Sequence, residues 1–420
     1  MPLRMLHFAD LHLGVDNHGH VDQATGLHSR LADFAATLAF VFDAAVEERV
    51  DLVLFAGDVY RNSTPSPTVQ REFARQLRRL REARIPIVFI IGNHDSPAAF
   101  GRATSVDVFQ ALELEGTHVV RAPRLLRLVT ASGPLQVAGL PWPSRHYLRT
   151  HDDYRELGME ALNARVQQIC EARIAAFAAE LDGTAPAVLA AHITAAEAVY
   201  SGSERTATIG HDPTLLTSAL AHPAFDYVAL GHLHRHQNLN PTGTPPVVYA
   251  GSVERVDFGE EADTKGFCLV DLPERPSRGA AFRFIHTPAR RFVTVAVPDR
   301  DAGAGDLTEA VTAAIATADV EGAIVRVTYP APQGGDQLDM GLVRQALRGA
   351  HCIAGIIPRQ APRPHQRRAA ISEHMGLVEA LDCYIANNPE LAAERDALQL
   401  GAAELVGEVE SGPSPGGAAP

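Results

Sequence analysis

The stretch Met5-Leu6-His7-Phe8-Ala9-Asp10-Leu11-His12 joins a short apolar run to two side chains that can bind a metal ion. Apolar runs of about four to eight residues are typical of buried strands. Four later segments repeat this arrangement, with polar side chains directly after an apolar run. They are Gly57-Asp58 after residues 52–56, Gly92-Asn93-His94-Asp95 after residues 85–91, His192 after residues 187–191, and Gly231-His232-Leu233-His234 after residues 227–230.

Longer amphipathic segments separate these runs, and their apolar residues recur at helical spacing. They cover residues 31–48, 68–83 and 153–181. Strands that alternate with helices predict a layered α/β domain. Because open α/β folds build their sites at the carboxyl ends of the strands, we expect the five polar segments to converge along one edge of a sheet.

The polar side chains in these segments form a set suited to metal binding. In Asp-x-His and His-x-His, residues two apart in an extended segment point the same way, so both can reach one ion. Oxygen and nitrogen ligands without a thiolate suit manganese, iron or zinc better than calcium. Seven ligands exceed the share of one ion but suffice for two ions bridged by a carboxylate, the usual arrangement for hydrolysing phosphate esters. The predicted ligands are Asp10, His12, Asp58, Asn93, His192, His232 and His234.

A plainer interpretation is open for each segment alone. A single aspartate or histidine near a strand end is equally well a cap or a satisfied polar residue. Five such segments in order, each behind a predicted strand, favour the metal site.

Taken together, the five segments resemble the motifs of the calcineurin-like metallophosphoesterase superfamily. The resemblance implies a layered sandwich of mixed β-sheets flanked by helices. It also implies that His94 protonates the leaving oxygen or stabilises the transition state, within a dyad oriented by Asp95, and that a hydroxide bridging the metals is the nucleophile. By the same resemblance each ion has four ligands, one of them shared: Asp10, His12, Asp58 and His234 for one ion, and Asp58, Asn93, His192 and His232 for the other.

Longer segments are similar to one branch of this superfamily, the nuclease subunits of bacterial double-strand-break processing complexes. The similarity implies a manganese-dependent nuclease that acts as an exonuclease on double-stranded DNA and as an endonuclease on hairpins and single strands. It further implies a homodimer that works with an ATPase partner. The alternative is a phosphatase or small-molecule phosphodiesterase of the same superfamily. The segments are Phe8-Ala-Asp-Leu-His-Leu-Gly14, Ala56-Gly-Asp-Val-Tyr60, residues 226–234 with Gln237, and Ala250-Gly-Ser-Val-Glu-Arg-Val-Asp-Phe-Gly-Glu260.

The chain divides where its composition changes. Residues 1–287 are predicted to form the nuclease domain, and the alternating pattern of 288–358 predicts a small α+β domain, which the resemblance identifies as a capping domain. A proline- and arginine-rich linker (359–369) leads to a helical pair (370–407) that packs on its own domains or, as the resemblance implies, docks on the coiled coil of the ATPase. The Gly/Pro/Ser/Ala-rich tail, 408–420, is expected to be disordered.

The net charge argues against strong DNA binding by this chain alone. Lys+Arg 37 against Asp+Glu 50 leaves −13, and phosphate affinity comes chiefly from cationic contacts. The best cationic element is the predicted helix 68–84, in which Arg71, Arg75 and Arg78 share a face. These arginines, with Arg61, are candidate DNA contacts, although a solvated charged face is an equally good interpretation.

Cysteines and apolar runs indicate the compartment. The four cysteines stand far apart with no CxxC pair, which is typical of a reducing interior. With no stretch approaching the ~18 apolar residues of a membrane span, we expect a cytoplasmic, nucleoid-associated protein without a membrane partner. The insert 16–28 carries His18, His20 and His28, which are expected to be exposed loop residues rather than part of the site.

Overall fold

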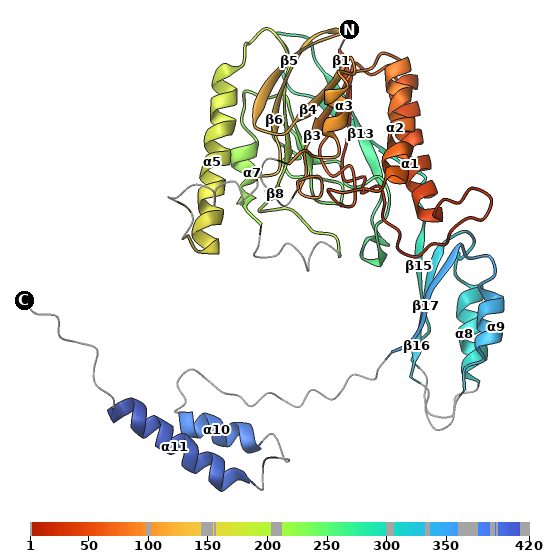
Figure 1. Cartoon of the computed structure of the whole chain (residues 1–420), viewed down its shortest axis with the longest axis vertical. Helices are drawn as coiled ribbons and strands as arrows, with labels where there is room; N and C mark the ends of the chain where they lie inside the picture. The colour runs from red at the N-terminus through yellow and green to blue at the C-terminus, as the bar shows by residue number, and fades with distance from the viewer. Residues whose placement is uncertain are drawn as a thin grey trace, which may run out of the picture. The chain divides into compact units, whose positions relative to one another are not determined.

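The computed structural model, shown in Figure 1, describes residues 2–97, 102–143, 154, 157–202, 212–299, 306–331, 337–359, 377–386, 391 and 394–411. The chain forms two compact units, Met1–Ile357 and Pro358–Pro420.

The first unit is built on two β-sheets. Strands β1 to β4 run parallel, whereas β13 is antiparallel to β1 and β14 is antiparallel to β13. Among the described residues, the order across this first sheet is β14 (Ala281–His286), β13 (Gly266–Leu272), β1 (Leu3–Phe8), β2 (Leu52–Phe55), β3 (Ile87–Ile90) and β4 (Thr117–Val120).

The second sheet has the same mixed character. Its four inner strands run parallel, and the strand at each edge is antiparallel to its neighbour. Within the described part of the chain its order is β11 (Gln237–Asn238), β12 (Val247–Tyr249), β10 (Tyr227–Gly231), β7 (Ala187–His192), β6 (Gly133–Leu140) and β5 (Arg124–Thr130).

The two sheets pack face to face, and helices cover their outer faces (Figure 1). Met5 of β1 joins Val188 and Ala229 in the cluster between the sheets. Because successive side chains of a strand point to opposite faces, Leu6 and Phe8 lie instead in the cluster beneath helices α1 (Ser29–Glu47) and α2 (Pro67–Glu82). Helix α5 (Met159–Glu180) covers the second sheet in the same way. The predicted sandwich of mixed sheets flanked by helices is confirmed.

A smaller group of elements follows β14 in the sequence. Its order is β15 (Phe292–Ala296), α8 (Leu307–Ala316), β16 (Ile324–Pro330), α9 (Met340–Ala346) and β17 (Cys352–Arg359). The three strands form their own sheet, with β15 and β16 parallel, and the helices bury Val311 and Val343 in a separate core. This is the strand–helix alternation predicted for residues 288–358; its role as a capping domain stays a prediction.

The second unit contains a helical pair, α10 (Leu377–Ala386) and α11 (Arg395–Ser411). Arg395 donates to Asp382 across the pair at 3.1 Å. The predicted disordered tail starts too early, because α11 runs through Ser411. Residues 412–420 and the predicted linker after Arg359 lie outside the described residues.

Two simpler features were also predicted. Cys170, Cys268 and Cys352 are free thiols. Of the helices described, none is both long enough and apolar enough to cross a membrane.

Candidate metal centre

Five loops, each following a strand, meet at one end of the sandwich. Three leave β1, β2 and β3 of the first sheet, and two leave β7 and β10 of the second. The prediction of a single sheet edge is therefore wrong. The two sheets are stacked with the carboxyl ends of these strands together: Nδ1 of His192, at the end of β7, lies 2.7 Å from the Ala56 carbonyl oxygen that follows β2.

The first cluster of predicted ligands holds Asp10, His12 and His234, whose ligand atoms all lie within 4.8 Å of one another. Nε2 of His12 is 2.9 Å from Nε2 of His234, and the same nitrogen of His12 is 3.8 Å from Oδ2 of Asp58. All these side chains are buried.

The second cluster lies around Asn93. Its Oδ1 is 2.9 Å from Nε2 of His192 and 3.1 Å from Nδ1 of His232. Nε2 of His192 is also 3.3 Å from Oδ2 of Asp58. Asp58 therefore borders both clusters, and the structure brings together all seven predicted ligands.

The backbone at this site is strained. Asp10, His12, Asp58 and His232 have φ values of 53°, 48°, 60° and 103°. Left-handed backbone costs a non-glycine residue on the order of 1–3 kcal/mol and persists only where the surroundings enforce it. Here the amide of Asp10 donates to the Gly57 carbonyl at 3.0 Å, and the amide of His232 donates to the Asp10 carboxylate at 3.0 Å. The loops hold one another in these conformations.

Two glycines permit the close approach of the loops. A Cβ atom at Gly57 would lie 2.0 Å from Nδ1 of His192, and one at Gly92 would lie 2.1 Å from Oδ1 of Asp58. Gly57 also has a φ of 105°, which favours glycine. Side chains at these positions would displace the predicted ligands.

The predicted dyad requires a hydrogen bond between the side chains of Asp95 and His94, and the described structure contains none. The Asp95 carboxylate instead accepts hydrogen bonds from the backbone amides of Asp58, Val59, Tyr60 and Gly92, at 2.9–3.3 Å. This buried carboxylate thus holds the loop that carries Asp58, since loop amides left without partners are costly when buried. Nδ1 of His94 lies instead 2.8 Å from the carbonyl oxygen of Arg61.

The carboxylates and imidazoles of the clusters shift one another's pKa values. Burial acts to lower the pKa of His192, but the carboxylates of Asp58 and Asp10 outweigh it and raise the pKa to about 9. Burial acts to raise the pKa of Asp58, but His192 and the imidazoles around it lower it well below its usual range. Buried carboxylates surrounded by imidazole nitrogens form the mixed donor set that borderline divalent metals prefer. The residues present therefore fit two cations that share Asp58.

Some contacts of the site were not predicted from the sequence. Oε1 of Glu260 is 2.6 Å from Nδ1 of His234, and Trp142 packs on His232 with the ring centroids 4.8 Å apart. Oδ2 of Asp212 lies 3.4 Å from Nε2 of His232. The sequence did contain signals: Glu260 ends the segment 250–260 that carries the family resemblance, and Trp142 is the single tryptophan. Lys265, the single lysine of the chain, pairs with Glu260 at 2.9 Å.

The arginines predicted to contact DNA are all engaged with carboxylates. Arg61 pairs with Asp16, and Arg71 and Arg75 both pair with Glu72. Arg78 pairs with Glu82 at 3.2 Å. All four arginine side chains are nevertheless exposed, and their contact with DNA stays a prediction.

The three histidines of the insert lie away from the predicted ligands. His18 packs on Phe258 and Phe292, with ring centroids 5.4 and 6.0 Å apart. Nδ1 of His28 accepts from the amide of Arg30 and so caps α1. His20 is exposed, as expected, whereas His18 and His28 are half-buried.

Residues 3–236 match the Calcineurin-like phosphoesterase family. The chain is similar to two bacterial proteins, each named as the D subunit of the nuclease SbcCD. That of Rhodobacter capsulatus is 33% identical over 301 residues, which are 68% of this chain and 69% of the relative. That of Bacillus subtilis is 29% identical over 273 residues, which are 64% of this chain and 66% of the relative. Each alignment thus spans about two thirds of the relative.

Solved structures are more distant. A dimetal phosphatase from Danio rerio is 11% identical with a TM-score of 0.41, over 67% of this chain and 99% of that one. A 5'-nucleotidase precursor from Thermus thermophilus is 14% identical with a TM-score of 0.38, over 69% of this chain and 55% of that one. Similarity this low does not bear on function.

Proposed function

The chain belongs to the calcineurin-like phosphoesterase family, and on that premise we propose that it is a metal-dependent DNA nuclease. The observation that carries the proposal is the convergence of seven predicted ligands in two clusters that share Asp58. Support for DNA as the substrate comes from the two relatives named as nuclease subunits.

The proposed cofactor is a pair of divalent cations, most simply Mn²⁺. When bound, such a pair polarises the phosphodiester and activates water for hydrolysis. The strained, buried loops would keep the ligand atoms in place before binding, so that little reorganisation is needed. The two proposed ligand sets are Asp10, His12, Asp58 and His234, and Asp58, Asn93, His192 and His232.

His94 is the proposed proton donor to the leaving oxygen. Its ring is exposed at the edge of the first cluster, 4.7 Å from the ring of His12 between centroids. The hydrogen bond from Nδ1–H to the Arg61 carbonyl orients the ring, so the proton that the imidazolium form would transfer is the one on Nε2. The backbone amide of His94 also donates to Oδ1 of Asp58 at 2.9 Å, which ties the proton donor to the shared ligand.

We further propose exonuclease activity on double-stranded DNA, endonuclease activity on hairpins and single strands, and assembly as a homodimer with SbcC. The helical pair α10–α11 is the proposed docking segment for the SbcC coiled coil. A chain ending at Arg368 should keep its metal sites but lose SbcC in a pull-down. Undiminished binding of SbcC to that shortened chain would contradict the docking role.

The decisive experiment for the function is cleavage of linear, hairpin and circular single-stranded DNA by the full chain with Mn²⁺, with and without SbcC and ATP. We expect cleavage that chelation abolishes. Asp58→Ala should be inactive because it removes the shared carboxylate, whereas Glu115→Ala, which removes an exposed carboxylate, should cleave as the parent does. Intact DNA under every condition would overturn the proposal.

A phosphatase or small-molecule phosphodiesterase is the second candidate. It is favoured by the net charge of −13 and by the pairing of Arg61, Arg71, Arg75 and Arg78 with carboxylates, both of which weaken attraction for a polyanion. Turnover of a cyclic nucleotide or a phosphoprotein far above that of DNA would establish it instead.

A further inference from the structure

Glu260 is a fully buried carboxylate that touches a predicted metal ligand. Its Oε1 lies 2.6 Å from Nδ1 of His234. Its Oε2 accepts from Nζ of Lys265 at 2.9 Å and from the backbone amide of Val256 at 3.0 Å. The carboxylate is therefore held in one orientation by groups on three sides.

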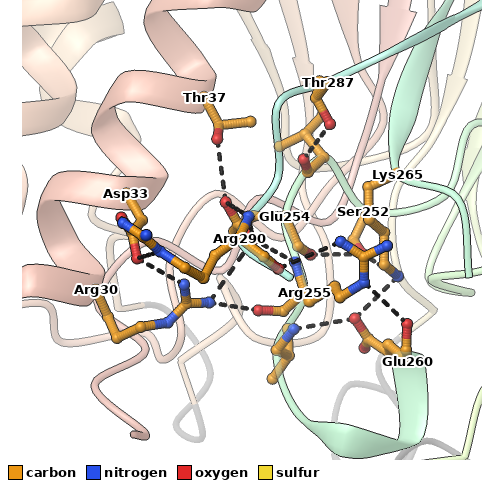
Figure 2. A network of polar contacts seen from close by, with 12 residues as sticks. Arg30, Asp33, Thr37, Ser252, Glu254, Arg255, Glu260, Lys265, Thr287 and Arg290 are labelled. Atoms are coloured by element: carbon orange, nitrogen blue, oxygen red, sulfur yellow. Dashed lines mark hydrogen bonds and ion pairs between the residues drawn. The ribbon is translucent and has the colours of Figure 1, made fainter. Parts of the chain in front are cut away.

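Lys265 holds both members of this contact. Its side chain is completely buried, and Nζ donates to the backbone carbonyl of His234 at 3.1 Å and to Oγ of Ser252 at 2.8 Å. Figure 2 shows Lys265 and Ser252 close to Glu260 within one polar network. A buried ammonium is tolerated only where carboxylates and hydrogen-bond acceptors compensate it. Here the nearer carboxylate is Glu260, the one on His234, while Oδ2 of Asp263 lies 3.9 Å from Nζ.

We propose that Glu260 is a positioning residue for His234 and that Lys265 keeps it in place; this inference rests on the proposed metal-dependent function. A carboxylate that accepts from Nδ1–H keeps the proton on that nitrogen. Nε2 then keeps its lone pair directed toward His12 and Asp10, where the first cluster lies. A carboxylate behind a ligating imidazole also raises its basicity, and losing such a partner typically costs about 10–100-fold in metal affinity.

The competing explanation is that Glu260 serves only to neutralise Lys265. Two variants separate the explanations. Glu260→Asp keeps the charge that Lys265 needs but withdraws the carboxylate from His234. The double variant Glu260→Gln with Lys265→Met removes both charges together, so that no buried ion is left without its partner.

Glu254 provides a matched control in the same network. It is as buried as Glu260 but accepts from Thr37 of α1 and from the amide of Arg290, as Figure 2 shows. Its partners in the described structure include no predicted metal ligand. Glu254→Gln should therefore affect folding stability without affecting metal affinity.

The experiment is a calorimetric titration of each full-length protein with Mn²⁺ alone, together with its metal-free unfolding temperature. We expect the parent to show two sites. Glu260→Asp and the double variant should unfold near the parental temperature but bind at one of the two sites about 10–100-fold more weakly, while Glu254→Gln keeps parental affinity at both.

Parental Mn²⁺ affinity at both sites in either folded Glu260 variant would overturn the positioning role and leave the proposed function intact. Equal weakening in Glu254→Gln would also overturn it, because the effect would then belong to the network as a whole. A parent that binds no Mn²⁺ would overturn the positioning role and the proposed function together.

Discussion

His94 lies at the exposed edge of the metal centre, and its two possible roles give different results on substitution. It lies close enough to His12 and Asp58 for its ring to serve as a further ligand, but its Nδ1 is engaged by the Arg61 carbonyl. As the proton donor, His94→Ala should bind Mn²⁺ like the parent and cleave DNA about 10²–10⁴-fold more slowly. His20→Ala, which removes an exposed histidine away from the site, is the control for both measurements. Loss of Mn²⁺ binding in His94→Ala would make it a ligand.

Substitution of Gly57 tests whether the loops that follow β2 and β7 must approach each other as closely as they do. Gly57→Ala would place Cβ 2.0 Å from Nδ1 of His192 on a backbone with a φ of 105°. We expect a loss of about 1–3 kcal/mol in the free energy of unfolding, together with weaker Mn²⁺ binding. The measurements are denaturant unfolding and metal titration. Gly183→Ala, where a Cβ meets no atom within 4 Å, should change neither, and an equally tolerant Gly57 would show that the loops have room to move.

At the scale of elements, helix α2 is the candidate DNA-contacting surface. Arg75 and Arg78 are 59% and 75% exposed, and each pairs with a carboxylate of the same helix, Arg75 with Glu72 and Arg78 with Glu82. If they contact phosphates, replacing both with glutamine should weaken DNA binding and reduce the salt dependence of log K by about one for each contact. Binding measured over a salt series checks this. Arg173→Gln on α5, which covers the other sheet, is the control. If this variant loses as much DNA affinity as the α2 variant, the attraction is unspecific.

Part of the element order was predictable because strands such as β2 and β7 are short apolar runs and helices such as α1 are amphipathic. Strand β5, in which exposed and buried residues alternate, was not predicted. The number of sheets was not predictable. β2 and β7 read alike as buried runs, yet β2 pairs with β1 and β3 in one sheet and β7 pairs with β10 and β6 in the other. Pairing depends on hydrogen bonds between segments distant in sequence, which local periodicity does not encode. For the same reason the sequence predicted ligands at one sheet edge, when they come from two sheets.

For the whole molecule, His7 makes the stability of the sandwich sensitive to acid. Its side chain lies between the sheets, where Nδ1 is 3.1 Å from the hydroxyl of Tyr227, and burial lowers the pKa of His7 to about 3. The unfolded chain, with a pKa near 6.5, binds this proton first as pH falls. Stability should therefore decline from about pH 6.5 towards pH 3, by up to about 1.4 kcal/mol per pH unit from this group.

The measurement is the free energy of unfolding of the metal-free chain at pH 7.5 and pH 5. His7→Phe should reduce the difference between the two values, because phenylalanine cannot bind the proton. His20→Phe, at an exposed position, should leave the difference unchanged. An unaltered pH dependence in His7→Phe would assign the acid sensitivity to the other buried histidines.

The sequence by itself determined the α/β class and the places where polar segments follow strands, and it supplied the set of predicted ligands. Those features are local, since they depend on residue type, glycine position and hydrophobic period within short stretches of the chain. Only the tertiary structure decided that Asp95 supports the Asp58 loop, that the Arg61 carbonyl orients His94, and that Glu260 lies behind His234. These contacts join segments between 26 and 37 residues apart in the chain. Such contacts depend on how the stacked sheets bring their loops together, and local sequence patterns do not predict that arrangement.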